Sequence, residues 1–389
     1  MNGLTCLTRK LGGFYWFSGC AFIMAQGSIR GESDFWLDIP AGKRSDAEAM
    51  QLQRLIFETI SNAEPLSRSA SHPFQDHIPE AISPWLQPTA SATGAGIAEI
   101  LTFVVIDGAR VPNIPEMIEA YGLEGRSLFG EGADERLIAS GPWLVQLEPG
   151  NRFIRRFFLE GCEQRSDQAL WMENWGIFIR SRSGLNGLSG HFRKFTKIKD
   201  ENGQWLFFRF WDTDFMGLYL RQKNAAQLPL VLRLLDPAVI ERALVFNPFD
   251  GAYSVRLDLS GDIAQSLQPK IGFRREEFDA VGVALADRRA ARAYHASYRK
   301  LLGGEGLDEL RARISEARAA CSALGITQEG LPGTFILLGT IFDRRFWQGD
   351  AFRAYWSKAR TSPDMRFKTY LSALKAQILK ARLPLKPWW

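Results

Sequence analysis

The chain has 389 residues, which is enough for two domains, and its composition suits a folded, soluble protein: 46% hydrophobic and 23% charged. The formal net charge of +5 is too small to indicate nucleic-acid binding by itself. The four cysteines have no C-x-x-C spacing, and there are only four histidines. The sequence therefore predicts neither a disulfide framework nor a zinc site.

An apolar stretch, Gly12–Ala25, follows two basic residues near the N-terminus. It is too short to cross a bilayer as a helix. It fits a signal peptide, a buried segment or a start codon set too far upstream, and the sequence leaves open whether residues 1–24 belong to the mature protein. No later segment is long enough to span a membrane, so we expect no membrane insertion.

Residues 1–95 are predicted to form an N-terminal extension with one helix and a linker. Ser45 and Glu48 have the spacing of a capping box, which opens a helix of about four turns. The apolar positions of this helix are Met50, Leu52, Leu55, Ile56 and Ile60. Pro65–Gly96 is rich in Pro, Ser, Ala, Thr and Gly, which is typical of a linker or a long surface loop.

Residues 96–228 are predicted to form an α/β domain, because strand-like and helix-like segments alternate. The expected extended segments are Leu101–Ile106, Ser127–Phe129, Gly141–Leu147 and Trp175–Arg180. The expected helices are Pro115–Tyr121, Arg152–Gly161 and Leu185–Lys194. A hairpin follows them, so we expect the sheet of this lobe to be mixed rather than purely parallel.

The hairpin is the strongest local signal in the chain. Lys197–Lys199 and Trp205–Trp211 read as strands, and Asn202-Gly203 between them is a typical turn. Asp212 then stands where a helix N-cap is expected, and Asp214 adds negative charge to the first turn. No His, Lys or metal-ligand spacing lies nearby, so we interpret these two aspartates as helix-capping rather than catalytic.

Residues 229–389 are predicted to form a mostly helical domain. Leu230–Leu235 and Tyr253–Leu259 fit short strands at its start. The expected helices are Asp287–Leu302, Leu307–Leu324, Asp350–Ala359 and Asp364–Leu383. Within the second of these, apolar residues recur at helical spacing and Gly325 follows as a C-cap.

Two other functions have partial signals in the sequence. Gly184, Gly187 and Gly190 lie between a strand and a helix, but their spacing differs from the G-x-G-x-x-G dinucleotide fingerprint. An enzyme with an unrecognised, nucleotide-dependent site is therefore one alternative. The basic residues of the helix Asp287–Leu302 make a nucleic-acid-binding module another. We predict no catalytic residue, no cofactor and no metal site.

The aromatic strand of the hairpin is unusual because both of its faces are apolar. Trp205, Phe207, Arg209 and Trp211 would share one face of an extended strand. Such a strand is either central and buried on both sides or part of an interface. Arg209 is the least expected residue in a buried strand, so it is predicted to pair with Asp212 or Asp107 or to anchor a partner.

Six short stretches follow one another in an ordered pattern: Ile106–Ala109, Ser127–Gly130, Gly141–Val145, Trp175–Ser181, His191–Arg193 and Arg209–Asp212. In order and approximate spacing they resemble the motifs of the type VI secretion adaptor chaperones, a family once catalogued only as a domain of unknown function. The resemblance covers about Leu101–Leu220. The chain departs from it at Trp211, where tyrosine is usual, and at Thr213, where proline is usual.

The resemblance implies a non-enzymatic adaptor, located in the bacterial cytoplasm, that binds a secreted effector. It would help to load the effector onto the valine-glycine-repeat spike protein of the secretion machine. Its partners would be the effector and the spike, with no nucleic acid. A mixed α/β lobe with many aromatic residues offers sheet edges and apolar grooves to a partner segment. The candidate partner-binding residues are Trp205, Arg209, Trp211, Asp212, Trp143 and Trp175.

Overall fold

The structure is a computed structural model. It describes residues 53–66, 78–93, 96–130, 132–148, 150–159, 170, 171, 173–222, 225, 228–259, 274–298, 302, 306–341, 344–358 and 360–380. The N-terminal apolar stretch and the capping box at Ser45 lie outside these residues. The chain forms two compact units: the described residues up to Val281 make a sheet unit, and those from Gly282 make a helical unit.

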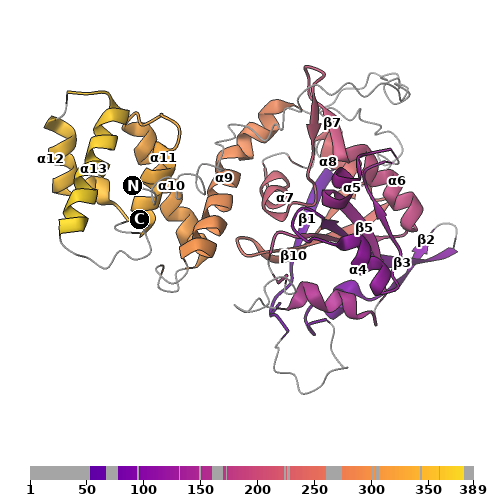
Figure 1. Cartoon of the computed structure of the whole chain (residues 1–389). Coiled ribbons are helices and arrows are strands. Elements are labelled where there is room, and N and C mark those ends of the chain that lie inside the picture. Colours follow the sequence, from indigo (N-terminus) through magenta and orange to yellow (C-terminus); the bar gives the residue numbers. More distant parts are fainter. Residues whose placement is uncertain are drawn as a thin grey trace. The chain divides into compact units, whose positions relative to one another are not determined.

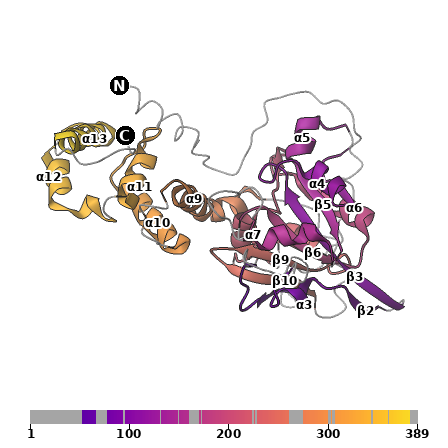
Figure 2. The same ribbon diagram turned by 60° about the horizontal axis from the view of Figure 1, so that its bottom comes forward.

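An eight-stranded sheet is the framework of the sheet unit, with strand order β1-β10-β9-β6-β3-β5-β4 and with β2 paired to the first part of β3. The strands are β1 (Gln53–Thr59), β2 (Thr89–Thr93), β3 (Gly96–Asp107), β4 (Gly125–Ser127), β5 (Pro142–Leu147), β6 (Gly176–Ser181), β9 (Ile240–Asn247) and β10 (Gly251–Leu259). β2 and the first part of β3 form an arm that extends beyond the other strands (Figure 2).

The predicted α/β class is confirmed, but the sheet differs from the mixed one that we expected. Each pair of strands in this sheet is antiparallel over the described residues. Parallel neighbours need a crossover that returns the chain to the same end of the sheet. Here β5 and β6 run parallel to each other, but β3 lies between them and runs opposite to both, so the chain returns to the same end of the sheet without making a parallel pair.

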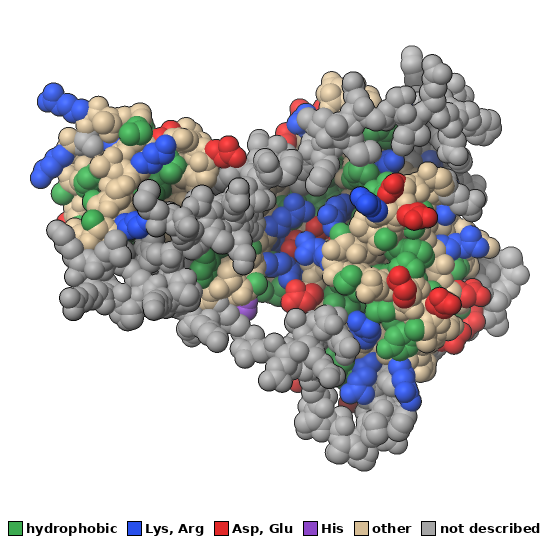
Figure 3. Space-filling view, viewed as in Figure 1, with side chains coloured by type: hydrophobic (Ala, Val, Ile, Leu, Met, Phe, Trp, Pro, Cys, Tyr) green, Lys and Arg blue, Asp and Glu red, His purple; other side chains and the backbone are tan. Residues whose placement is uncertain are grey.

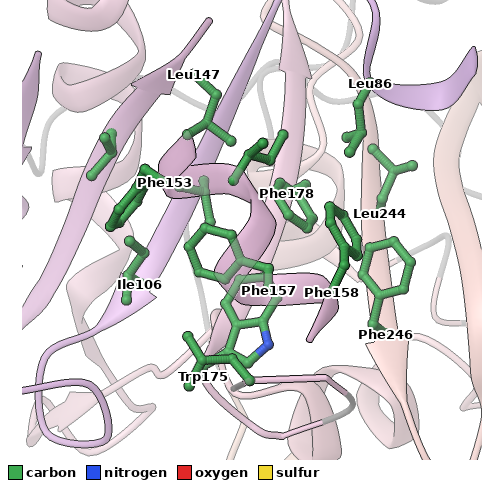
Figure 4. Close-up of a cluster of buried hydrophobic side chains, with 14 of the residues drawn as sticks. Leu86, Ile106, Leu147, Phe153, Phe157, Phe158, Trp175, Phe178, Leu244 and Phe246 are labelled. Atoms are coloured by element: carbon green, nitrogen blue, oxygen red, sulfur yellow. The ribbon is translucent and has the colours of Figure 1, made fainter. Parts of the chain in front are cut away.

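One face of the sheet is covered by short helices and carries most of the aromatic core (Figure 4). The helices are α3 (Ser83–Leu86), α4 (Ile114–Ala120) and the 3₁₀ helix η1 (Arg152–Phe158), while α5 (Glu135–Ser140) precedes β5. Phe157 of η1 lies against Trp175 and Phe178, with ring centroids 4.3 and 5.5 Å apart. Full burial of each such ring stabilises the fold by about 1.5–3 kcal/mol.

The opposite face of the sheet is covered by α6 (Leu185–Thr196), α7 (Thr213–Tyr219) and α8 (Pro229–Leu234). Side chains alternate along a strand, so Val104 and Ile106 join the aromatic core while Phe103 and Val105 face the other way. Phe192 of α6 and Met216 of α7 line a small apolar cavity over Ile177 and Ile179 of β6. The sheet is therefore the middle of three layers.

Three predicted elements are corrected. The helix expected over Ser45–Ile60 is, in its described part, the strand β1, because its aromatic and β-branched residues pair with β10. Pro65–Gly96 is not only a linker, since it contributes α3, β2 and the buried side chain of Ile82. The segment Leu230–Leu235 is not a strand: its first five residues lie in α8, which has Pro229 at its first position, and Leu235 is the C-cap of that helix.

The sheet extends on both sides of the segment predicted as one domain, residues 96–228. β1 comes from the N-terminal extension, and β9 and β10 come from the segment assigned to the C-terminal domain. The strand expected at Tyr253–Leu259 is confirmed as β10. Antiparallel pairing puts the end of β9 beside the start of β6, which brings Asn247 to the end of the sheet where the motif stretches lie.

The helical unit confirms the predicted helical C-terminal part. Its elements are α9 (Arg275–Tyr298), whose first residues belong to the sheet unit, α10 (Leu307–Ala323), α11 (Leu331–Ile341), η5 (Phe346–Gln348), α12 (Asp350–Lys358) and α13 (Pro363–Lys380). Phe335 of α11 lies at the centre of its aromatic core, within 5.4 Å of the rings of Phe346, Trp347 and Phe367. Among the described helices, none has the length and apolar character needed to cross a lipid bilayer.

Gly176 is predicted to be essential for the pairing of β3 with β6. Its φ is +152°, and an added Cβ would lie 1.9 Å from the carbonyl oxygen of Val105. We expect Gly176→Ala to lower the free energy of unfolding by on the order of 3 kcal/mol, measured by urea denaturation. Gly130→Ala, where an added Cβ meets no atom within 4 Å, is the control and should change stability by less than about 0.5 kcal/mol.

Candidate functional site

The six motif stretches converge at one end of the sheet, although 99 residues lie between the first stretch and the last. The end of β3 meets the starts of β5 and β6. The Gly108 N–H donates to the Gly141 carbonyl at 2.9 Å, and the Asp107 N–H donates to the Trp175 carbonyl at 2.7 Å. An added Cβ at Gly108 would lie 2.4 Å from the Ala139 carbonyl oxygen, so this close approach requires glycine.

The remaining stretches join the same assembly through α6 and the loop after β4. The Leu128 N–H donates to the Pro142 carbonyl at 2.9 Å. The Arg193 guanidinium donates to the Ser127 carbonyl at 3.3 Å. The rings of Phe192 and Phe210 stack with centroids 4.8 Å apart. The six motifs are therefore parts of one connected structure.

Arg209 forms an ion pair with Asp107, which is one of the two partners expected for it. The Asp107 side chain is only 3% exposed, whereas that of Arg209 is 37% exposed. Arg110 is a second cation, with its Nε 3.6 Å from the Asp107 carboxylate. Burial raises the pKa of Asp107, and the charges of Arg209 and Arg110 oppose that rise. The pair therefore holds the segment after the hairpin against the end of β3.

A buried polar network surrounds the start of α7, and we call it the α7 cap network: Asn174, Asp212, Thr213, Asp214 and Asn247. Asp212 is the predicted N-cap, since its Oδ1 accepts from the Phe215 N–H at 3.0 Å. The same oxygen accepts from the Asn174 amide at 2.7 Å. Asp214 accepts from the Asn247 amide at 2.8 Å, so both carboxylates are held by amide donors.

Thr213 has a structural role at the position where the resembling proteins usually carry proline. Its backbone N–H donates to Asn174 Oδ1 at 2.8 Å, a bond that proline could not make. Its hydroxyl oxygen also accepts from the Asn247 amide at 3.1 Å. Thr213 thus links the segment before β6 to the end of β9. These two hydrogen bonds take the place of the rigid backbone that proline would supply at this position.

The predicted hairpin exists, but its second strand is shorter than expected. β7 (Lys197–Lys199) pairs with β8 (Trp205–Phe207), and Gly203 has the positive φ of +77° that the turn requires. Trp205–Trp211 was expected to be one strand, but only its first three residues pair with β7. Phe208 and Phe210 turn into the core, where both are fully buried.

The structure separates the six candidate partner-binding residues by burial. Trp175, Trp211 and Asp212 are at most 3% exposed and belong to the core or to the α7 cap network. Trp143 is half-buried, with its Nε1 donating to the Ile138 carbonyl at 3.0 Å. Trp205 is 60% exposed on the hairpin, and Arg209 is partly exposed at its base. Among the six, these last two are the most open to a partner.

Lys197, Lys199 and Phe207 were not among the predicted partner-binding residues, although the hairpin register could have shown where they lie. Lys197 is exposed, whereas Lys199 and Phe207 are half-buried, and the Phe207 ring lies 5.8 Å from that of Phe129. With Trp205 the two lysines and Phe207 lie on one side of the hairpin, and we call these four residues the hairpin face. On the other side, Ile198 is buried and Leu206 is half-buried. Figure 1 shows the hairpin projecting at the top of the sheet unit.

The structure also shows where the two segments that suggested alternative functions lie, the glycine-rich segment after β6 and the basic helix. Gly187 and Gly190 lie inside α6, which begins directly after Gly184, so this segment is a helix rather than a glycine-rich loop. On the predicted basic helix, Arg288 is buried and Asp287 accepts from Arg318 at 2.6 Å. Over the residues that the structure describes, no His, Cys, Asp or Glu side chains group into a possible metal site.

Residues 102–230 match the model of a family described as Domain of unknown function (DUF4123). This segment contains all six motif stretches and the hairpin. Among curated proteins, no match to the chain was found. Among solved structures, none matches either.

Asn174 is predicted to be the main support of the α7 cap network. Asn174→Ala removes a donor from the buried Asp212 and Asp214 and the acceptor of the Thr213 N–H. We expect it to lower the free energy of unfolding by about 3 kcal/mol. The control is Asn202→Ala on the exposed hairpin turn, for which chemical denaturation should show little change; equal losses would contradict this role.

The ion pair at Asp107 predicts a pH-dependent effect of Arg209→Met. Without Arg209, Asp107 remains buried with a weaker counter-charge, so its folded-state pKa rises further above the unfolded value. We expect a loss of about 2 kcal/mol at neutral pH that shrinks as the pH falls through the raised pKa and Asp107 takes up a proton. Urea denaturation at several pH values measures this. Arg110→Met, which leaves Arg209 in place, should show a smaller effect.

Proposed function

We propose that this protein is a non-enzymatic adaptor that binds a type VI secretion effector in the bacterial cytoplasm and helps to load it onto the valine-glycine-repeat spike protein. The observation that carries the proposal is the assembly of all six adaptor-like motifs into one connected site. The family match over residues 102–230 covers the same segment. Both point to a shared structural unit built around the hairpin.

The arrangement suits binding, because a rigid base supports an exposed contact. The hairpin follows α6 directly, and its second strand leads into Arg209 and the α7 cap network. Fixed segments of this kind lose little conformational entropy when they bind. Trp205 is a large, exposed aromatic side chain on this support, and tryptophan is enriched among the residues that dominate binding energy.

The surface around the hairpin would supply specificity rather than most of the affinity. Over the sheet unit, Figure 3 shows charged side chains of both signs interspersed with hydrophobic ones on the face in view. Such a surface is polar enough to remain in water without its partner. We propose that the sheet unit binds the effector and that the helical unit, which is compact by itself, contacts the spike.

A pull-down from the native host, read by mass spectrometry, tests the proposal. The tagged wild-type chain should recover a toxin-like protein or the spike protein. Trp205→Ala should reduce effector recovery by roughly 30-fold, as expected for a residue worth about 2 kcal/mol of binding. Recovery of neither partner would overturn the adaptor function.

The matched control is Met365→Ala, which truncates another exposed apolar side chain, in the helical unit. It should leave effector recovery unchanged. If Trp205→Ala and Met365→Ala both leave recovery at the wild-type level, the adaptor function stands and the effector surface lies elsewhere. Thermal unfolding of each variant shows whether the fold is intact, which exposed positions should allow.

A further inference from the structure

The hairpin face carries two positive charges beside its two aromatic rings. Lys199 Nζ lies 4.8 Å from the ring centroid of Trp205, and Lys197 Nζ lies 5.6 Å from that of Phe207. These lysines are directly opposite the rings in the hairpin register. A lysine above an aromatic face keeps its N–H donors available to a second, anionic group.

Positive charge predominates in the segment of chain that forms this face, since four basic residues (Arg193, Lys194, Lys197 and Lys199) outnumber the two acidic ones (Asp200 and Glu201). Arg193 and Lys194 are exposed in the last turn of α6, directly before β7. The two acidic residues of the hairpin have other hydrogen bonds. Asp200 is buried and its Oδ1 accepts from the Asn202 and Gln204 N–H groups. The Glu201 carboxylate accepts from the Arg275 N–H at 2.9 Å. An acidic partner would therefore meet a complementary surface.

The backbone of β8 adds a second type of contact. Hydrogen bonds from Asp200 N to Gln204 O and from Phe208 N to Thr196 O flank the ladder. Bonded pairs alternate along an antiparallel ladder, so Ile198–Leu206 is bonded and the pairs containing Trp205 and Phe207 are not. The N–H and C=O groups of Trp205 and Phe207 therefore point away from β7. Among the described residues, β8 pairs with β7 alone.

We infer that the hairpin face binds an extended, acidic peptide segment that carries an aromatic or aliphatic side chain. The segment adds to the outer edge of β8, its carboxylates meet Lys197 and Lys199, and its apolar side chain lies against Trp205. This inference rests on the proposed function, because the segment would belong to the effector. A peptide fits better than single-stranded nucleic acid, since only a peptide backbone can continue the β ladder.

Fluorescence polarisation with the full chain tests the inference. The probe is a labelled synthetic peptide in which glutamate alternates with phenylalanine and valine. Two comparison probes are the same peptide with lysine in place of glutamate, and a single-stranded DNA of equal net charge. We expect the acidic peptide to bind and the lysine peptide not to bind. The affinity should fall as salt screens the charges.

Substitutions on the hairpin face test whether this face is the surface that binds the acidic peptide. The double variant Lys197→Glu/Lys199→Glu should weaken acidic-peptide binding at least roughly tenfold, and so should Trp205→Ala. Arg136→Glu reverses an exposed charge on α5 of the same unit and should have no effect. No binding of the acidic peptide, or binding that these variants leave unchanged, would overturn the inference. Tighter binding of the DNA, lost in the double variant, would assign the face to nucleic acid instead.

The same double variant, used in the host pull-down, separates this inference from the adaptor function. An effector recovered equally by wild type and by Lys197→Glu/Lys199→Glu would keep the adaptor function and exclude the acidic segment. Recovery of no effector and no spike would remove the adaptor function, while the peptide titration would still decide whether the hairpin face binds acidic segments. If wild type recovers the effector and the double variant does not, the result supports both the adaptor function and the binding of an acidic segment.

Discussion

The α7 cap network is the constraint on which the sheet unit depends. Two carboxylates, Asp212 and Asp214, are buried at the start of α7, where ionised groups are costly unless donors surround them. The donors come from Asn174 before β6 and from Asn247 at the end of β9. Neither segment can move without exposing a charge to an apolar core. The network therefore fixes α7 relative to the strands that it covers.

The rest of the site follows from that fixed position. The chain that enters α7 passes through Arg209, whose ion pair with Asp107 ties it to the end of β3. Immediately before Arg209 lies the hairpin, which also leads back to α6 and its stacked Phe192. At the far end of α7, Tyr219 donates a hydrogen bond to the Glu277 carboxylate at 2.8 Å, so the first turn of α9 is held as well.

Sequence periodicity predicted the elements whose signals are local. The hairpin turn at Gly203, the N-cap at Asp212 and the spacing of Leu310 and Ile314 in α10 all depend on neighbours close in the chain. Periodicity did not predict the elements whose pairing partners are distant in the chain. β1 is a strand because β10, about 200 residues later, pairs with it. The burial of Trp211 and Trp175 is likewise set by packing, which explains why composition alone made both look like surface anchors.

The hairpin separates the residues that maintain the fold from those that would contact a partner. Ile198 and Leu206 face inward, while Lys197, Lys199, Trp205 and Phe207 share the opposite side. If this side binds a partner, as proposed, substitutions of its lysines or of Trp205 can change which partner is recognised without disturbing the core beneath. Evolution could therefore vary specificity on this side while the buried scaffold stays constant. A single scaffold of this design could serve many different cargo proteins.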